Sequence, residues 1–512
     1  MKIRRVLIIV IPILFIFSLV FFSIMPKILQ KEEQAFQAAR QQGWTTYFQE
    51  EEDLSKGSFG GEGNKIITDT TGKIWVAGEP RLGGLSFFDG TTWILRHTGS
   101  YSDLALGPQG QMLAVHESGD SVDGVEIYDG QDWKIYDGPR SKEAKYNTNQ
   151  EIIQVEVDGN GRIWVVMNDF GTQTISEMSI DQDKAVATFS QPEITIKKGQ
   201  IKSLEADSQG NLWASIWHFD DAESSDEWPS GLYVFNGEKW KQISGQGVDL
   251  RRVVATAFDK QGTAWIATEC GGVMTYDGKN WDTILAENTV SKCKESSLRL
   301  LKGIAIDNQD RVWVWSEQSV KFLNGKDWVT FTPENSGFAE VTPYGPFISD
   351  VMVDDLDQVW IAYSGGVSMS AIEDIQPLAK EVTIQHARSV ALTTRLQGKI
   401  WLVSSLLALL WLALYFNMPR SIILALIISL IVSILMGPPM VQPFYDYEYS
   451  YPNPLLIAII FGILGGLVGG LIYKTTQFQN KTKPPWDIMV MIFGFVVPFC
   501  LCSSFIFFAG HP

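Results

Sequence analysis

The chain has 512 residues, of which 45% are hydrophobic and 12% aromatic, so it is too long for one ordinary core and too apolar for a disordered chain. Its formal net charge of −17 argues against a nucleic-acid-binding protein, because displacing counterions along the phosphates requires a basic surface. We therefore expect more than one domain and no nucleic-acid partner.

The N-terminus has the pattern of a membrane anchor. Lys2, Arg4 and Arg5 precede an apolar run at residues 6–25. About twenty apolar residues suffice to cross the hydrocarbon core of a bilayer. A cleaved signal peptide is the alternative, but the run is long and no small-x-small cleavage site follows it closely. We predict a cytoplasmic N-terminus at residues 1–5, an uncleaved transmembrane anchor at 6–25 and a linker at 26–42.

A repeat unit fills residues 43–372. Its first half reads Asp-x-x-Gly-x-apolar-Trp, with Asp in place of Gly in the last two copies and Leu113 in place of Trp in a degenerate copy. The Trp markers are Trp75, Trp164, Trp213, Trp265, Trp313 and Trp360. The second half is an aromatic residue, then Asp-Gly or Asn-Gly, then a strand led by Trp, as in Tyr276-Asp277-Gly278 before Trp281. A period of about forty to fifty residues with four short strands per unit is typical of a β-propeller.

Two further features of the repeat predict its geometry. Asp-Gly between apolar runs indicates a hairpin with a type I′ turn, which needs positive φ at both central positions. The last unit lacks its fourth strand, whereas the segment from Trp44 to Phe48 resembles a fourth strand and precedes the first complete unit. We predict that this segment closes a ring of seven blades, because closure removes exposed sheet edges. The third blade lacks the Asp-Gly turn and the Trp that follows this turn in the other units.

The repeat resembles the two-component regulator propeller family, whose units read roughly Gly-x-Ile-Trp-Val-Gly/Ala-Thr, then Gly-Gly-Leu, then aromatic-Asp/Asn-Gly. The likeness is carried by the run from Gly72 to Gly78, and by Ala264 to Thr268 followed by Gly271 and Gly272. It covers the propeller only. The resemblance implies an extracytoplasmic input domain. In that family a cytoplasmic kinase or other output domain usually follows a transmembrane helix, whereas nothing after residue 372 could hold a phosphoacceptor and an ATP site.

The marker residues have a structural interpretation. One Trp per blade is most simply explained as core between blades, and an Asp before a turn caps its own backbone. Strand order places the Asp-x-x-Gly and Asp-Gly turns on one face of the propeller, and the longer loops on the other face.

The candidate binding loop is the most unusual of these longer loops, because it is acidic and contains aromatic residues. Its candidate residues are His218, Asp220, Asp221, Glu223, Asp226, Glu227 and Trp228. The alternative is an ordinary solvated acidic loop. Cys270 and Cys293 fall on the same face, where they form either a disulfide or two free thiols.

Nothing in the sequence indicates a metal site, a cofactor or a known catalytic motif. The five His residues form no metal-spaced pair, and the Cys residues lack CxxC spacing that would suggest a metal. Residues Asp307 to Asp310 are faintly similar to a calcium loop but lack its remaining oxygen ligands. An enzyme with an active site assembled from several propeller loops stays the alternative function, since fold does not fix function.

The C-terminal part is predicted to be a linker at residues 373–399 and a four-span transmembrane domain at 400–512, with apolar segments near 400–417, 421–435, 454–473 and 487–509. Basic residues around Arg420 and Lys481 place two of the connecting loops in the cytoplasm and the propeller outside, whereas Arg388, Arg395 and Lys399 count against this topology. Gly462, Gly466 and Gly470 form a small-residue stripe that suits helix packing within this unit or between two copies.

Together these features predict a multi-pass protein of the cell membrane with an all-β, seven-bladed propeller ectodomain and an α-helical transmembrane region. The predicted function is sensing or recognition of a small ligand or protein partner by the propeller, without catalysis. The bilayer lipids are the other expected partner.

Overall fold

The computed structural model describes residues 10, 13, 24, 27, 28, 30–48, 63–78, 84–97, 99–117, 124–139, 150–181, 186–190, 193–218, 228–244, 249–269, 272–286, 300–339, 346–364, 366–379, 382–386, 388 and 389. The chain divides into two compact units, one of residues 1–34 with 384–512 and the other of residues 35–383. Residues 30–40 are helical, and in the first unit His386 Nε2 lies 3.0 Å from Glu33 Oε2.

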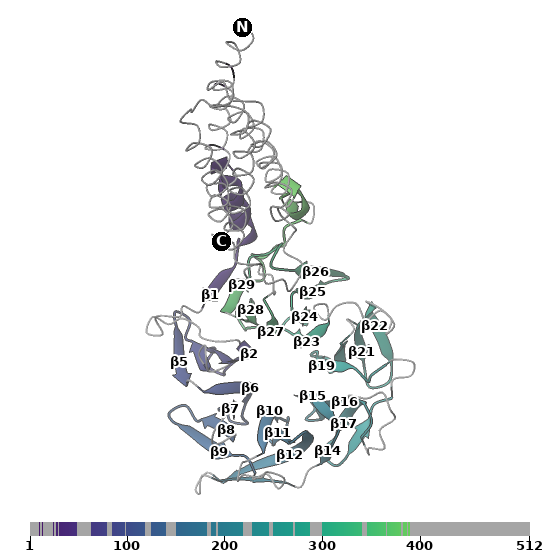
Figure 1. Ribbon diagram of the computed structural model, residues 1–512. Coiled ribbons are helices and arrows are strands. Elements are labelled where there is room, and N and C mark those ends of the chain that lie inside the picture. The colour runs from purple at the N-terminus through teal and green to yellow at the C-terminus, as the bar shows by residue number, and fades with distance from the viewer. Residues whose placement is uncertain are drawn as a thin grey trace, which may run out of the picture. The chain divides into compact units, whose positions relative to one another are not determined.

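The second unit is a seven-bladed β-propeller, as the repeat predicted (Figure 1). Each blade is an antiparallel sheet whose first strand lies innermost in the ring. Blade 1 contains β2 (Gly63–Thr68), β3 (Ile74–Gly78), β4 (Leu85–Phe88) and β5 (Trp93–His97). Blade 2 contains β6 (Ser100–Leu106), β7 (Met112–Glu117), β8 (Gly124–Tyr128) and β9 (Trp133–Asp137). Blade 3 contains β10 (Glu151–Val157), β11 (Ile163–Asp169), β12 (Thr172–Asp181), β13 (Val186–Phe189) and β14 (Ile194–Ile196).

The remaining blades follow the same order. Blade 4 contains β15 (Gly199–Ala206), β16 (Leu212–His218), β17 (Gly231–Phe235) and β18 (Trp240–Gln242). Blade 5 contains β19 (Val253–Phe258), β20 (Ala264–Thr268), β21 (Gly272–Tyr276) and β22 (Trp281–Ala286). Blade 6 contains β23 (Leu301–Ile306), β24 (Val312–Ser316), β25 (Val320–Asn324) and β26 (Asp327–Phe331). Blade 7 contains β27 (Ile348–Val353), β28 (Gln358–Tyr363), β29 (Gly366–Ala371) and β1 (Thr45–Phe48).

Blade 7 closes the ring with a strand from the other end of the propeller sequence. β1 pairs with β29 in antiparallel register, with Thr45 opposite Met369 and Phe48 opposite Gly366. The predicted closure is therefore confirmed. Tyr47, on β1, also contacts blade 1. Its ring centroid lies 5.4 Å from that of Phe88 and 5.8 Å from that of Trp93.

Blade 3, the unit without the Asp-Gly turn, is built differently from the others. Its long third strand, β12, pairs with β13 over one part of its length and with β14 over another. The turn before β12 has positive φ at both Phe170 (50°) and Gly171 (87°), which is the type I′ pattern.

The Asp-Gly hairpins of the other blades do not have the predicted type I′ turn. In blade 1, Asp89 N donates to Thr92 O, so the two central residues are Gly90 and Thr91. Only Gly90 has a positive φ, 100°. Positive φ at the first central position alone fits a type II′ turn. The physical reason is that Asp89 stands outside the central pair, where its Oδ1 accepts the N–H groups of Thr91 and Thr92.

The first turn of each regular blade is tied to its marker Trp. In blade 4, Asp207 Oδ1 accepts the N–H groups of Gln209 and Asn211, while Asp207 Oδ2 accepts Trp213 Nε1–H at 2.9 Å. The same Asp–Trp bond, at 2.8 to 3.1 Å, occurs in the other blades with a marker Trp, in the pairs Asp69–Trp75, Asp158–Trp164, Asp259–Trp265, Asp307–Trp313 and Asp354–Trp360. The motif therefore fixes both the turn and the buried indole.

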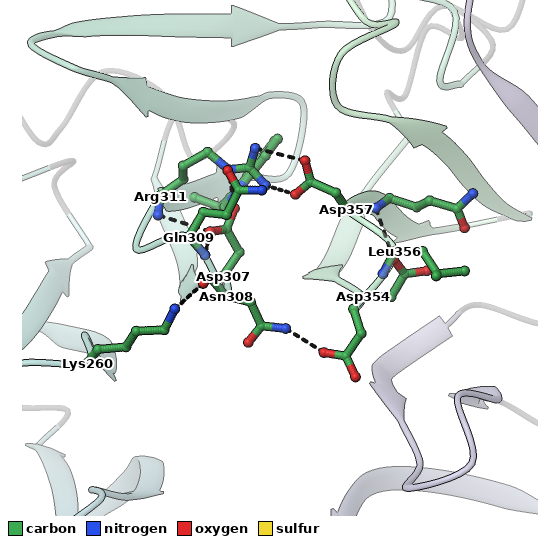
Figure 2. A network of polar contacts seen from close by, with 11 residues as sticks. Lys260, Asp307, Asn308, Gln309, Arg311, Asp354, Leu356 and Asp357 are labelled. Atoms are coloured by element: carbon green, nitrogen blue, oxygen red, sulfur yellow. Dashed lines mark hydrogen bonds and ion pairs between the residues drawn. The ribbon is translucent and has the colours of Figure 1, made fainter.

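Blades 6 and 7 place Asp where the other turns have Gly. Asp310 and Asp357 have φ values of 59° and 62°, in the left-handed region that favours glycine. Figure 2 shows that the Arg311 guanidinium contacts the carboxylates of both Asp357 and Asp307. In the same network Lys260 of blade 5 donates to the Asn308 carbonyl of blade 6. These contacts join the turns of three consecutive blades.

The predicted membrane segments lie outside the described residues, except for a few positions in 6–25. Within the part of the chain that the structure describes, no helix has the length and hydropathy that a membrane span requires.

Candidate functional site

The innermost strands of all seven blades share one irregularity, a β-bulge near their start. The ladder register between the first and second strand skips one residue at the same place in every blade. The residues directly after the bulge are therefore structurally equivalent, and they are Lys65, Asp103, Gln154, Ser203, Ala255, Gly303 and Asp350. Two residues later, on the same side of each strand, are Ile67, Ala105, Glu156, Glu205, Ala257, Ala305 and Met352.

Five charged residues in these two layers form what we call the axial cluster, which consists of Lys65, Asp103, Glu156, Glu205 and Asp350. They come from blades 1, 2, 3, 4 and 7, whose inner strands surround the ring axis (Figure 1). One lysine faces four carboxylates, so the cluster is acidic when every group is ionised. Asp350 is 7% exposed and the other four residues are partly buried.

Two of these carboxylates also join neighbouring blades. Asp350 Oδ2 accepts the Ile66 N–H of blade 1 at 3.0 Å. Asp103 Oδ2 accepts the Val155 N–H of blade 3 at 2.9 Å. The aspartates therefore contribute to the structure, whereas no such bridge is recorded for the side chains of Glu156 and Glu205 in the described part of the chain.

Burial shifts the acid–base behaviour of the cluster. Desolvation raises the pKa of Asp103 to about 6 and that of Glu205 to about 7, although Lys65 opposes both shifts. Desolvation also raises the pKa of Glu156 well above its ordinary value, with the nearby charge of Glu205 adding to the effect. The pKa of Lys65 is raised, chiefly by Asp350, so this lysine stays charged. Near neutral pH the cluster can thus hold protons or attract a cationic group.

The ends of the candidate binding loop are held together. His218, the last residue of β16, has its Nε2 2.8 Å from the Trp228 carbonyl, and its N–H donates to Ser230 Oγ. The Trp228 ring packs edge-on against Tyr233 at 5.5 Å. The intervening candidates, Asp220, Asp221, Glu223, Asp226 and Glu227, lie outside the described residues, so the structure does not bring the predicted set together.

The structure describes some of the other predicted residues and not the rest. Trp75, Trp164, Trp313 and Trp360 are each 1% exposed and pack in the blade core, and Trp213 is 8% exposed. Trp265 packs at the edge of a core cluster. Cys270, Cys293 and the stripe Gly462, Gly466 and Gly470 lie outside the described residues. Among the residues that the structure does describe, no group of His, Cys, Asp and Glu could hold a metal ion.

Sequence reasoning missed the axial cluster, although a signal was present. When the units are aligned on their markers, Glu156 and Glu205 stand eight residues before Trp164 and Trp213, where the other units have Ile, Met or Ala. Lys65 stands ten residues before Trp75. The sequence therefore indicated the cluster by charged residues at a repeat position where the other units have small or apolar residues.

Comparisons with known proteins give no family for this chain. No protein-family model matches the chain, and no curated protein sequence matches it. Among solved structures it is similar to a streptogramin B lyase, with 12% identity over 65% of this chain and 98% of that one and a TM-score of 0.46. It is also similar to YCF48 bound to D1 peptide, with 14% identity over 66% and 97% and a TM-score of 0.43.

A third similar structure is the extracellular domain of BT3049 from B. thetaiotaomicron, described as a hybrid two-component system. The identity is 16% over 63% of this chain and 42% of that one, with a TM-score of 0.42. This chain therefore matches less than half of that domain. At these identities and TM-scores the likenesses carry no conclusion about function.

Proposed function

We propose that this protein is a membrane-anchored, extracytoplasmic recognition module, in which the propeller binds a small ligand or a protein partner and has no catalytic activity of its own. The observation that carries the proposal is the axial cluster. The other five blades place Ala, Ile or Met at the position of Glu156 and Glu205, so the fold does not require charge there. Buried carboxylates cost stability unless they are well paired, and groups with strongly shifted pKa values are concentrated at functional sites.

The location is proposed from the sequence. The apolar run at 6–25 and the four segments within 400–512 suit one N-terminal anchor and a multi-pass C-terminal unit in the cell membrane. The distribution of basic residues between these segments favours an external propeller. The resemblance to the two-component regulator propeller repeats also favours a propeller on the extracytoplasmic side of the membrane. Binding at the propeller would then be coupled to a partner through the membrane segments.

An extracytoplasmic enzyme is the second candidate function, and one observation favours it. Carboxylates with pKa values near neutrality suit general acid and base catalysis, and Asp103 and Glu205 have pKa values raised to about 6 and about 7. This alternative predicts conversion of a ligand at the propeller, whereas the recognition module predicts binding without turnover.

The experiment is cross-linking of the full-length protein in its own membrane, followed by purification and identification of bound proteins and small molecules. The wild type is compared with the Glu156→Ala/Glu205→Ala variant, which introduces the residue that blades 2, 5 and 6 carry. Glu238→Ala, on an exposed turn of blade 4, is the matched control.

We expect a partner or ligand to be enriched with the wild type and the control and lost with the double variant. A version with the propeller deleted after the first span should also lose it. Equal enrichment with wild type and double variant would contradict a role of the cluster in recognition. Recovery of a chemically altered ligand, only with intact carboxylates, would favour the enzyme instead.

A further inference from the structure

Two cations, from blades 4 and 5, lie against one indole, and a third cation belongs to the neighbouring blade 6. Trp217 lies in β16, is 6% exposed, and donates its Nε1–H to Val253 O of blade 5 at 2.7 Å. This hydrogen bond holds the ring across the seam between blades 4 and 5. The indole is therefore a fixed platform rather than a mobile side chain.

Two cationic groups lie against this ring. Lys202 Nζ, from β15, is 5.3 Å from the centroid of Trp217, and Arg252 Cζ, from the residue before β19, is 5.2 Å from it. A cation over the face of an aromatic ring is attracted by the quadrupole of the ring. The indole therefore attracts both cationic groups.

A third cation, Lys302, adds to the positive field. Lys202 and Lys302 occupy the bulge position of their inner strands, where the other blades carry Asn64, Ser102, Ile153, Val254 and Ser349. Burial lowers the pKa of Lys202 and the charge of Lys302 lowers it further, whereas the charge of Glu269 opposes the shift. Lys302 therefore acts electrostatically on Lys202.

The neighbouring carboxylates compensate this charge only in part. Glu269 pairs with Arg252 at 3.5 Å, and Glu317 pairs with Lys302 at 2.8 Å. In the described part of the chain Lys202 has no carboxylate in an ion pair. Three cations and two carboxylates leave one positive charge in a protein whose formal net charge is −17. The side chains of Arg252 and Lys302 are 48% and 41% exposed, so an incoming ligand can reach them.

We propose that Lys202 and Arg252, which lie against Trp217, form together with Lys302 an oxyanion-binding subsite that takes a carboxylate, phosphate or sulfate group of a small-molecule ligand. The inference rests on the proposed recognition function and names the chemistry of its ligand. An oxyanion accepts hydrogen bonds from the lysine ammonium and the arginine guanidinium, and it offsets the repulsion between the cations.

The test is isothermal titration of the full-length protein in detergent at low ionic strength. Citrate and inorganic phosphate are the two probes, and sodium chloride at matched ionic strength is the reference. We expect saturable binding of at least one probe, weakening as salt is added because exposed charge interactions are screened. Preference for citrate or for phosphate would distinguish a carboxylate ligand from a phosphorylated one.

Variants locate the binding. Lys202→Met, which keeps the length of the side chain but removes its charge, should weaken binding by about tenfold or more. Lys302→Gln, at a more exposed residue, should weaken binding by a smaller factor. It tests the subsite even if Lys202→Met does not fold. Lys241→Met, at an exposed position of β18, is the matched control and should bind as the wild type does.

Two outcomes would overturn the inference, namely no saturable binding of either probe, or equal affinity of the wild type and both variants. These outcomes are distinguishable from failure of the recognition function. If cross-linking still recovers a partner that depends on Glu156 and Glu205, the recognition function stands and only the oxyanion subsite is wrong.

Discussion

Among the residues of the axial cluster, Glu205 is the one whose burial most clearly lowers the stability of the folded protein when its carboxyl is ionised. Its carboxyl is partly buried on β15, opposite Trp213 in the ladder, and burial raises its pKa to about 7. Because the folded-state pKa exceeds that of the unfolded chain, the favourable contribution of the protonated group is complete below the unfolded pKa. It is lost as pH rises through about 7.

We therefore expect Glu205→Ala to stabilise the propeller at pH 8, by about 1–3 kcal/mol, and to change stability much less at pH 5. Thermal unfolding of both proteins across this range measures the effect. Glu238→Ala, at an exposed turn, should show no such pH dependence. If the wild type and Glu205→Ala differ by the same amount at pH 5 and pH 8, Glu205 does not titrate as described.

A gain of stability together with a loss of binding would identify Glu205 as a functional residue. Natural proteins retain destabilising groups where binding or catalysis needs them. Asp103 and Asp350 give a less clear result, because their carboxylates also accept backbone N–H groups of the neighbouring blades.

At the scale of the elements, the inner strand of blade 6 is specialised for one large side chain. A Cβ atom at Gly303 would lie 2.0 Å from Trp315 Cζ2, although Gly303 has an ordinary strand conformation. Gly303 is paired with Trp315 in the ladder, whereas blade 5 pairs Ala255 with Ala267 at the equivalent positions. The glycine is therefore required by the indole and not by the strand.

This pairing predicts strong coupling in a double-mutant cycle. Gly303→Ala alone should destabilise by about 1–3 kcal/mol through overpacking, and Trp315→Ala alone by about 3–5 kcal/mol through the cavity it leaves. In the double variant, which recreates the alanine pair of blade 5, Gly303→Ala should cost almost nothing. Denaturant unfolding of the four proteins measures the coupling. Equal costs of Gly303→Ala in both backgrounds would contradict the explanation.

The whole molecule depends on the closure of the ring between blades 7 and 1. β1 supplies the outer strand of blade 7, and the Tyr47 ring on that strand also lies within 6.4 Å of Trp360. Without this strand β29 would expose an edge, which is unfavourable for a soluble sheet. The contacts of Tyr47 thus join segments from opposite ends of the propeller sequence.

Tyr47→Ala should weaken this closure specifically. We expect a loss of about 2–4 kcal/mol, since several aromatic contacts are removed together. The amides of β1 and β29 should exchange hydrogen faster than those of blade 4. Tyr276→Ala is the control, because Tyr276 stacks at 4.6 Å on Trp281 within a single blade. Unchanged protection of β1 in Tyr47→Ala would show that the aromatic seam does not hold the closure.

The sequence by itself determined the features that depend on residues close together in the chain. The Asp-x-x-Gly-x-apolar-Trp unit predicted blades of four strands, because Asp207 and Trp213, for example, meet within a single hairpin. The segment after Trp44 predicted ring closure, since the strand missing from the last unit was present at the start of the propeller. The turn type was predicted wrongly, because Asp89 accepts hydrogen bonds from outside the central pair.

Only the tertiary structure decided which residues meet across the ring. Lys65 and Asp350 are far apart in the sequence, and they become neighbours because closure brings the inner strands of blades 7 and 1 together. The same holds for Lys202 and Arg252, which both lie against the Trp217 ring across a blade boundary. Repeat patterns describe contacts within one unit, whereas burial and charge at the axis depend on how seven units are arranged around it.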